Sequence, residues 1–211
     1  MYVPRHFAVD DATTAELLAS AGAAHLVTAT ADGLVATRLP YVWAPEVGGH
    51  GALQAHVART NDQWRRPPIG EAMAIVHGPD AYVTPSWYPT KAEHGRVVPT
   101  WNYVTAHVYG RLVVHDDEGW LAAHVHALTE RFEAGRAEPW AVDDAPPAFV
   151  AGQLRAVVGL ELVVTRVEAK EKLSQNRSAA DRAGVAAGFD SAGDAQMADA
   201  VRAAAGRKVG A

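Results

Sequence analysis

Two arginines are placed where they could bind an anion. Arg38 lies in an expected strand that follows a turn, and Arg59 lies with Thr60 and Asn61 at the end of the next expected strand. Guanidinium groups near a turn can form bidentate hydrogen bonds to a phosphate, each contributing about 1.5–3 kcal/mol when charge-assisted. A surface ion pair is the more common role of any one arginine. A planar phosphorylated ligand is favoured here by apolar and aromatic segments at Leu39-Pro40-Tyr41 and Trp101-Asn102-Tyr103.

The other residues that could bind a metal or take part in catalysis do not form a recognised motif. The ten histidines include no HExxH, and the nearest pair, His124 and His126, diverges on an expected helix, so we expect no metal site. The absence of cysteine excludes disulfides and a cysteine nucleophile. Ser86 and Ser174 lack the GxSxG context of a serine nucleophile. No Walker loop and no GxGxxG after a strand is present, so the catalytic residues stay unassigned.

Aromatic residues gather between residues 81 and 112, together with three prolines. Tyrosine and tryptophan bury much surface and carry a polar tip, which suits a ligand wall or a subunit interface as well as a core. In the expected strand from Pro99 to His115, alternation places the rings of Trp101, Tyr103 and Tyr109 on one side. Small or aliphatic residues occupy most of the other side.

The order of the elements predicts a mostly β protein with helices (α+β), an antiparallel barrel with helices packed around it. A hairpin is expected over residues 24–43 around Asp32-Gly33, and a helix is expected from Asp117 to Glu133. Further strands are expected at residues 52–58, 72–77, 81–84, 99–115 and 157–167, with a turn at Gly78-Pro79-Asp80 and an Ala-rich helical end at residues 194–205.

Composition is that of a globular protein, with 49% hydrophobic and 20% charged residues. No run is long enough to span a membrane and no signal peptide is recognisable, so we expect a cytoplasmic protein without a membrane partner. Residues 1–165 carry 11 Lys+Arg against 18 Asp+Glu, and residues 166–211 carry 8 against 6. Because the net positive charge of residues 166–211 is too small to indicate attraction to a phosphate backbone, DNA binding is possible but weakly supported.

The segment HLVTATADGLVATRLPYVW, followed by LQAHVARTN, resembles the opening hairpins of the FMN-binding split barrel, the fold of pyridoxamine-phosphate oxidases. The longer motifs MYVPRHF, GPDAYVTPSWYPTK, VPTWNYVTAHVYG and LSQNRSAADRAGVAAGF are similar to the PaiB family of FMN-binding negative transcriptional regulators. These motifs extend from Tyr2 to Phe189.

The resemblance implies a split-barrel FMN-binding domain over residues 1–173, a C-terminal helical extension over residues 174–211, and a homodimer with FMN between the subunits. It assigns Arg38, Arg59, Thr60 and Asn61 to the FMN phosphate. It places Leu39, Pro40, Tyr41, His56, Val57 and Ala58 at the border of the isoalloxazine ring. It assigns Thr100, Trp101, Asn102 and Tyr103 to the partner's side of the cofactor. The Ser174–Arg177 segment could be a lid, a second contact or a helix cap.

The chain departs from the family pattern at two places. The family often has histidine where this chain has Arg38, and often Pro-His where it has Asp62-Gln63. Arg38 favours a bound dianion, whereas Asp62 near a phosphate would repel it. The function that the resemblance implies is a flavin-binding regulator or sensor. The alternatives are an FMN-dependent oxidoreductase, in which His56, Tyr103 and His107 could handle protons, and a flavin- or haem-binding storage module.

Overall fold

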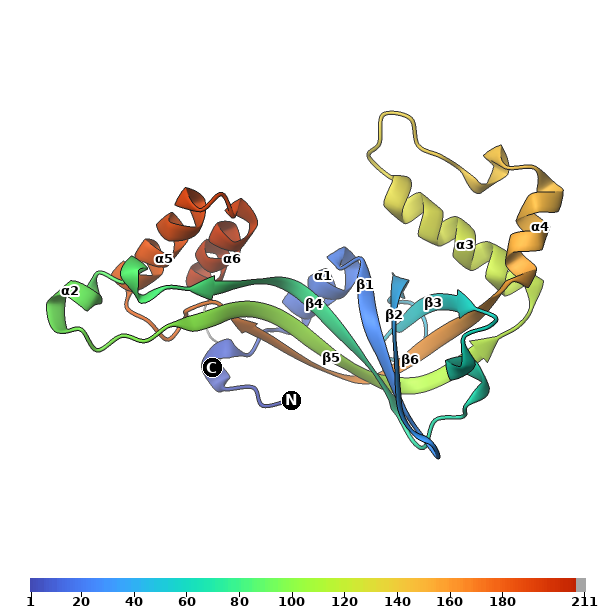
Figure 1. Ribbon diagram of the computed structural model, residues 1–211, viewed down its shortest axis with the longest axis horizontal. Helices are drawn as coiled ribbons and strands as arrows, with labels where there is room; N and C mark the ends of the chain where they lie inside the picture. Colours follow the sequence, from blue (N-terminus) through green and yellow to red (C-terminus); the bar gives the residue numbers. More distant parts are fainter. Residues whose placement is uncertain (208–211) are drawn as a thin grey trace. The chain divides into compact units, whose positions relative to one another are not determined.

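Six antiparallel strands close into a barrel in the order β1-β2-β3-β6-β5-β4 (Figure 1). The computed structural model describes residues 1–207. It confirms the expected fold class, an antiparallel β-barrel with peripheral helices. The strands are β1 (Ala23–Thr30), β2 (Gly33–Ala44), β3 (Ala52–Ala58), β4 (Ala72–Val83), β5 (Thr100–His115) and β6 (Val157–Lys172). The helices are α1 (Asp11–Ser20), α2 (Thr90–His94), α3 (Glu118–Glu133), α4 (Pro147–Arg155), α5 (Ala179–Ser191) and α6 (Ala195–Gly206).

The described chain divides into two compact units. The first unit contains Met1–Leu17, His77–Ala106 and the residues from Glu168 onward, and the second contains Leu18–Val76 and His107–Val167. Strands β4, β5 and β6 therefore contribute residues to both units. The expected domain division after residue 173 stays a prediction, and its boundary falls inside the first unit. Residues 208–211 of the expected helical extension lie outside the described part of the chain.

The β1–β2 hairpin opens the second unit. Thr30 pairs with Gly33, and the ladder continues to Ala23 opposite Pro40. Along β1 every second side chain is buried, as expected for a strand with one face toward the barrel interior. Because successive side chains alternate, this register turns Leu39 and Tyr41 inward and Arg38 and Pro40 outward.

Strand β4 differs from the expectation of two short strands. It runs without interruption through Gly78-Pro79-Asp80, where a turn was predicted. A Cβ atom at Gly78 would lie 2.9 Å from the Cβ of Val104, so the glycine permits close packing of neighbouring strands. The prediction was wrong because glycine and proline mark turns only when the chain has no tertiary reason to stay extended.

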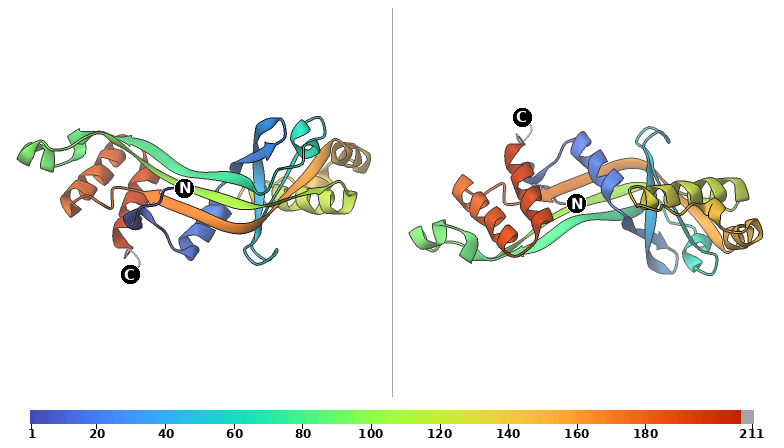
Figure 2. Two further views of the ribbon diagram at one scale, coloured as in Figure 1. Left: turned by 90° about the horizontal axis from the view of Figure 1, so that it is seen from below. Right: turned by 90° about the horizontal axis from the view of Figure 1, so that it is seen from above.

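Helices α5 and α6 supply much of the core of the first unit, and they lie side by side in both views of Figure 2. Ser178 caps α5 by accepting a hydrogen bond from the backbone N–H of Asp181, and Asp194 caps α6 in the same way through Met197. Their inner faces pack on residues from β4, β5 and the segment after β6. This core contains Val83, Tyr88, Val104, Leu173, Val185, Phe189, Met197 and Val201.

Helix α3 belongs to the second unit and is joined to the barrel by Arg131. This guanidinium donates hydrogen bonds to the backbone oxygens of Ala19, Ala21 and Tyr41. At the other end of α3, Asp117 accepts a hydrogen bond of 2.7 Å from the N–H of Trp120, which confirms the expected helix start. Between residues 1 and 207, every helix is too short or too polar to cross a membrane.

Candidate functional site

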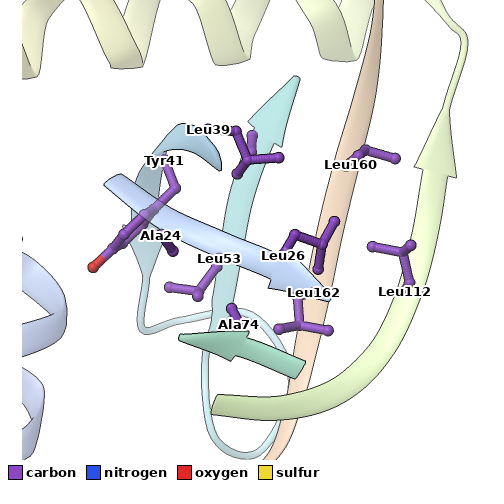
Figure 3. Close-up of a pocket in the computed structure, with 10 residues that line it drawn as sticks. Ala24, Leu26, Leu39, Tyr41, Leu53, Ala74, Leu112, Leu160 and Leu162 are labelled. Carbon is purple, nitrogen blue, oxygen red and sulfur yellow. The ribbon is translucent and has the colours of Figure 1, made fainter. Parts of the chain in front are cut away.

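The barrel interior within the second unit is filled by aliphatic side chains. Leu26, Leu39, Leu53, Leu160 and Leu162 are among the residues that line one small cavity (Figure 3). The space left between them is about 10 Å³, enough for one water molecule. A planar cofactor therefore has to bind on the outside of the barrel.

Arg38 lies on that outer face. Its side chain is exposed, and the ladder places it opposite His25 on β1. Among residues 1–207 its guanidinium makes no ion pair and no hydrogen bond. An exposed strand arginine without a partner keeps all its donors for a ligand.

Arg59 is held by the protein itself. Its Nε donates to the backbone oxygen of Arg155 at 2.8 Å, and its Nη2 donates to that of Val157 at 3.0 Å. Nη1 and Nη2 form a bidentate pair with Asp116 at 3.1 and 2.5 Å. The hydrogen bonds with Asp116 raise the pKa of Arg59 and lower that of Asp116. Arg59 therefore ties the end of β3 to the start of β6, and a phosphate would have to share it with Asp116.

The residues after Arg59 are also engaged. Asn61 donates to Thr37 Oγ1 at 3.1 Å and accepts a hydrogen bond from the N–H of Gln63, while Thr60 is exposed. Asp62 lies 3.6 Å from both Arg65 and Arg66. These two cations offset the charge of Asp62, which reduces its expected repulsion of a phosphate.

Gln63 is buried and hydrogen-bonded to both strands of the β1–β2 hairpin. Its Nε2 donates to the backbone oxygens of Leu26 and Val35 and to Thr28 Oγ1, at 3.1–3.4 Å. Its Oε1 is buried and has no partner among residues 1–207. This glutamine stands where the family often has histidine, and it has a structural role here.

The residues expected to border a flavin ring differ in whether their side chains face the barrel interior or its outer surface. Leu39, Tyr41 and Val57 are buried, so only their backbone could reach an outer ligand. Pro40 and Ala58 are exposed, and His56 is half-buried. The side chains available on the outer face are therefore those of Pro40, His56 and Ala58.

His56 is paired with His124 of α3, Nδ1 to Nε2, at 3.0 Å. His124 is 2% exposed, and no described residue is a partner of its Nδ1. A buried donor without an acceptor costs more than a bare acceptor, so the proton of His124 belongs on Nε2, where it donates to His56. His56 must then carry its own proton on Nε2. Burial lowers the pKa of His56, and burial together with His56 lowers that of His124 to about 4, which keeps both rings neutral.

Trp120 positions this pair. Its ring is stacked with that of His124, with the ring centroids 5.1 Å apart, and with that of His115, with the centroids 4.2 Å apart. A Cβ at Gly159, which pairs with His56 in the ladder, would lie 2.2 Å from the Trp120 ring. His115 faces Glu161 at 3.1 Å, and Glu161 accepts a hydrogen bond from Gln54. Sequence reasoning missed this cluster, although the four-residue spacing of Trp120 and His124 on one helix was a usable signal.

The residues assigned to the partner's side of a cofactor lie in the first unit. Trp101 is 53% exposed, and Tyr103 lies beneath the ammonium groups of Lys170 and Lys172, 5.2 and 5.8 Å from its ring centroid. Asn102 points the other way and is fully buried. Thr100 accepts a hydrogen bond from Lys172, which also bonds the backbone oxygen of Trp101.

Lys170 and Lys172 were not predicted. Both lie on β6, two residues apart and so on one face of the strand, and both approach the ring of Tyr103 on β5. Burial, with Lys170 and Arg177 nearby, lowers the pKa of Lys172. His107 lies in the second unit, where its ring is 6.4 Å from that of Tyr109. In the described chain no three His, Asp or Glu side chains are grouped as metal ligands.

Comparisons with known proteins add a family. A family model described as "Putative FMN-binding domain" matches residues 1–166. The "Protease synthase and sporulation protein PAI 2" of Bacillus subtilis is 32% identical over 184 residues, which cover 86% of this chain and 85% of that protein. An uncharacterized protein of Aspergillus fumigatus is 34% identical over 158 residues, 67% of this chain and 60% of that one.

Solved structures agree on the fold. A conserved hypothetical protein from Mycobacterium tuberculosis aligns with a TM-score of 0.58 at 13% identity, over 84% of this chain and 94% of its own. A flavocytochrome from Azotobacter vinelandii aligns with a TM-score of 0.58 at 15% identity, over 77% of this chain and 67% of its own. At such identities the likeness concerns the fold alone.

Proposed function

We propose that this chain, which belongs to the family described as "Putative FMN-binding domain" and is a PaiB-type protein, binds FMN as a homodimer and acts as a flavin-binding regulator or sensor. The observation that carries the proposal is Arg38, an exposed arginine on the outer face of the barrel with no partner among residues 1–207. A cationic group in this state gains most from an anionic ligand because no existing ion pair has to be broken.

The phosphate of FMN is proposed to bind Arg38, with Thr60 and Asn61 beside it. Thr60 offers an exposed hydroxyl, and Asn61 is fixed by its bond to Thr37. Arg59 contributes its charge and holds the end of β3 in place while it stays bound to Asp116. A charge-assisted hydrogen bond from Arg38 would contribute about 1.5–3 kcal/mol.

The isoalloxazine ring is proposed to lie along Leu39-Pro40-Tyr41 and His56-Val57-Ala58. The chemistry that FMN supplies when bound is the transfer of electrons through this ring. His56 presents an Nε2–H donor because His124 occupies its Nδ1. A fixed neutral donor can hydrogen-bond the ring's acceptor atoms without competing for a proton.

A second copy is proposed to cover the ring with Thr100, Trp101 and Tyr103. A tryptophan that is half-exposed on a strand, beside a tyrosine held under two lysines, has the aromatic character enriched at protein interfaces. Asn102 supports this surface from behind, since its side chain lies on the buried face. The buried residues of one strand thereby hold its exposed rings in position.

The regulatory role rests on the relative named for protease synthesis and sporulation. Direct DNA binding has little support from α5 and α6, because Arg202 is already paired with Asp190 and Asp199. We propose a cytoplasmic protein that senses flavin. Reduction of the bound flavin by NAD(P)H would instead support the FMN-dependent oxidoreductase, and salt-sensitive binding to promoter DNA would support direct regulation.

The experiment is a pair of titrations, one with FMN and one with riboflavin, followed by flavin fluorescence. Wild type is expected to bind FMN more tightly than riboflavin, which lacks the phosphate. Arg38→Gln is expected to weaken FMN about tenfold or more and to leave riboflavin unchanged. Arg111→Gln, at an exposed arginine on β5, is the matched control. Equal affinity for both flavins in wild type, or no binding of either, would contradict the proposal.

A further inference from the structure

The segment that follows β6 contains a residue in an unusual backbone conformation. Ser174 has φ of 67°, the left-handed region that residues other than glycine seldom adopt, and it is 4% exposed. Its hydroxyl donates to Asn102 Oδ1 at 3.1 Å. Such strain is concentrated at ligand sites because it persists only where the surroundings hold it.

Two buried donors beside Ser174 have no acceptor in the described part of the chain. They are the side-chain N–H2 of Asn102 and the hydroxyl of Tyr88, and the two residues are 0% and 2% exposed. Burial raises the pKa of the Tyr88 hydroxyl, whereas the nearby Arg177 and Ser174 lower it, which places both side chains close to this hydroxyl. Buried donors in this state are the exception in native proteins and indicate a missing partner.

The charges around these donors are mostly positive. The guanidinium of Arg177 lies 4.9 Å from the ring centroid of Tyr88 and makes no ion pair within residues 1–207. Arg182 donates to the backbone oxygen of Arg177, and its buried Nε has no partner in the described chain. Burial is the main cause of the lowered pKa of Lys172, and the neighbouring charges of Lys170 and Arg177 lower it further.

The nearby carboxylates already have partners. Asp181 accepts hydrogen bonds from the backbone N–H and the hydroxyl of Thr90, and Glu171 is paired with Arg207. The segment also leads into the N-terminus of α5, where the helix dipole favours a negative charge. Donors and positive charge therefore gather at one place without an acceptor to match them.

We propose that Tyr88, Asn102, Ser174 and Arg177 form a binding site for a small oxyanion, a carboxylate or a phosphate group. Such a group accepts from the amide of Asn102 and the hydroxyl of Tyr88 and pairs with Arg177. All four residues belong to the first unit, whereas Arg38 and the Arg59–Asn61 segment belong to the second. The site is therefore independent of the proposed flavin phosphate contacts at Arg38.

The test uses the full chain carrying Arg38→Gln, so that an anion bound at that arginine does not contribute. Thermal unfolding and calorimetric titration are measured with inorganic phosphate and with acetate, at ionic strength held constant with sodium chloride. At least one of the two anions is expected to raise the unfolding midpoint in a saturable manner. A saturable effect of phosphate alone assigns a phosphate group, and one of acetate alone assigns a carboxylate.

Arg177→Gln is expected to weaken this binding at least tenfold. Arg202→Gln, on the neighbouring helix α6 and already paired with acids, is the control and should leave it unchanged. A second readout is the Asn102 side-chain N–H2 resonance, which should shift with the same midpoint as the calorimetric curve. No saturable effect of either anion, or an equal response in Arg177→Gln, would overturn the proposal and leave a buried water as the partner of these donors.

Discussion

His124 makes the clearest quantitative prediction, because its environment differs sharply between the folded and unfolded states. It is buried against His56 and the ring of Trp120. Its pKa is lowered from 6.5 to about 4 in the folded protein, first by burial and then by His56. Between these two pH values the unfolded chain binds a proton at this position and the folded chain does not. The free energy of unfolding therefore falls as the pH is lowered through this window.

The magnitude follows from the shift. The pKa of His124 in the folded protein is about 2.5 below its ordinary value, and each pKa unit corresponds to about 1.36 kcal/mol. The free energy of unfolding should therefore be about 3 kcal/mol lower at pH 4 than at pH 7 because of this histidine. His124→Leu removes the titrating group and keeps an apolar side chain of similar size. The variant should lose the bond to His56, but its stability should depend less on pH below 6.5.

The assay is urea unfolding of wild type and variant, followed by tryptophan fluorescence at pH 7, 6, 5 and 4. The quantity compared is the change in the free energy of unfolding with pH, which is expected to be about 3 kcal/mol larger in wild type. His126→Leu is the matched control, since it lies on the same helix with its side chain 43% exposed. Parallel curves for wild type and His124→Leu would refute the assignment of a neutral, buried His56–His124 pair.

Three further predictions concern other parts of the chain. Arg59→Ala should lower the thermal unfolding midpoint and weaken FMN about tenfold, because it frees Asp116 and the end of β3; unchanged values in both assays would remove Arg59 from both roles. Ser174→Gly should be about 1 kcal/mol more stable than Ser174→Ala in chemical unfolding. Both variants lack the hydroxyl, and only glycine adopts a φ of 67° freely. Equal stability of the two variants would mean that this backbone is not strained. Gly188→Ala should destabilise the first unit by about 1–3 kcal/mol, because its Cβ would lie 2.2 Å from the ring of Trp87. Gly206→Ala is the control, since a Cβ at that position meets no atom within 4 Å. Equal destabilisation by the two substitutions would contradict the packing of Gly188 on Trp87.

The sequence alone determined the local structure wherever a side-chain pattern and an end signal agreed. The hairpin at Asp32-Gly33, the long strand ending at His115 and the helix beginning after Asp117 follow from alternation, helical spacing and a capping carboxylate. The alternation of side chains along β5 also predicted that Trp101 and Tyr103 lie on the opposite face of the strand from Asn102. The family resemblance, carried by motifs spread along the chain, indicated the barrel that these elements build.

Only the tertiary structure decided what the polar side chains bind. His56 and His124 are 68 residues apart, and Arg59 meets Asp116 57 residues away, so no local pattern could pair them. The same holds for Ser174 and Asn102, whose contact needs β5 and the segment after β6 to be neighbours. Backbone periodicity is a short-range property that survives in any fold, whereas a hydrogen bond between distant residues exists only after the chain has closed. For this reason Arg38 and Arg59, which look alike in the sequence, differ in the structure. Within residues 1–207 Arg38 has no partner, whereas every nitrogen of the Arg59 guanidinium donates a hydrogen bond.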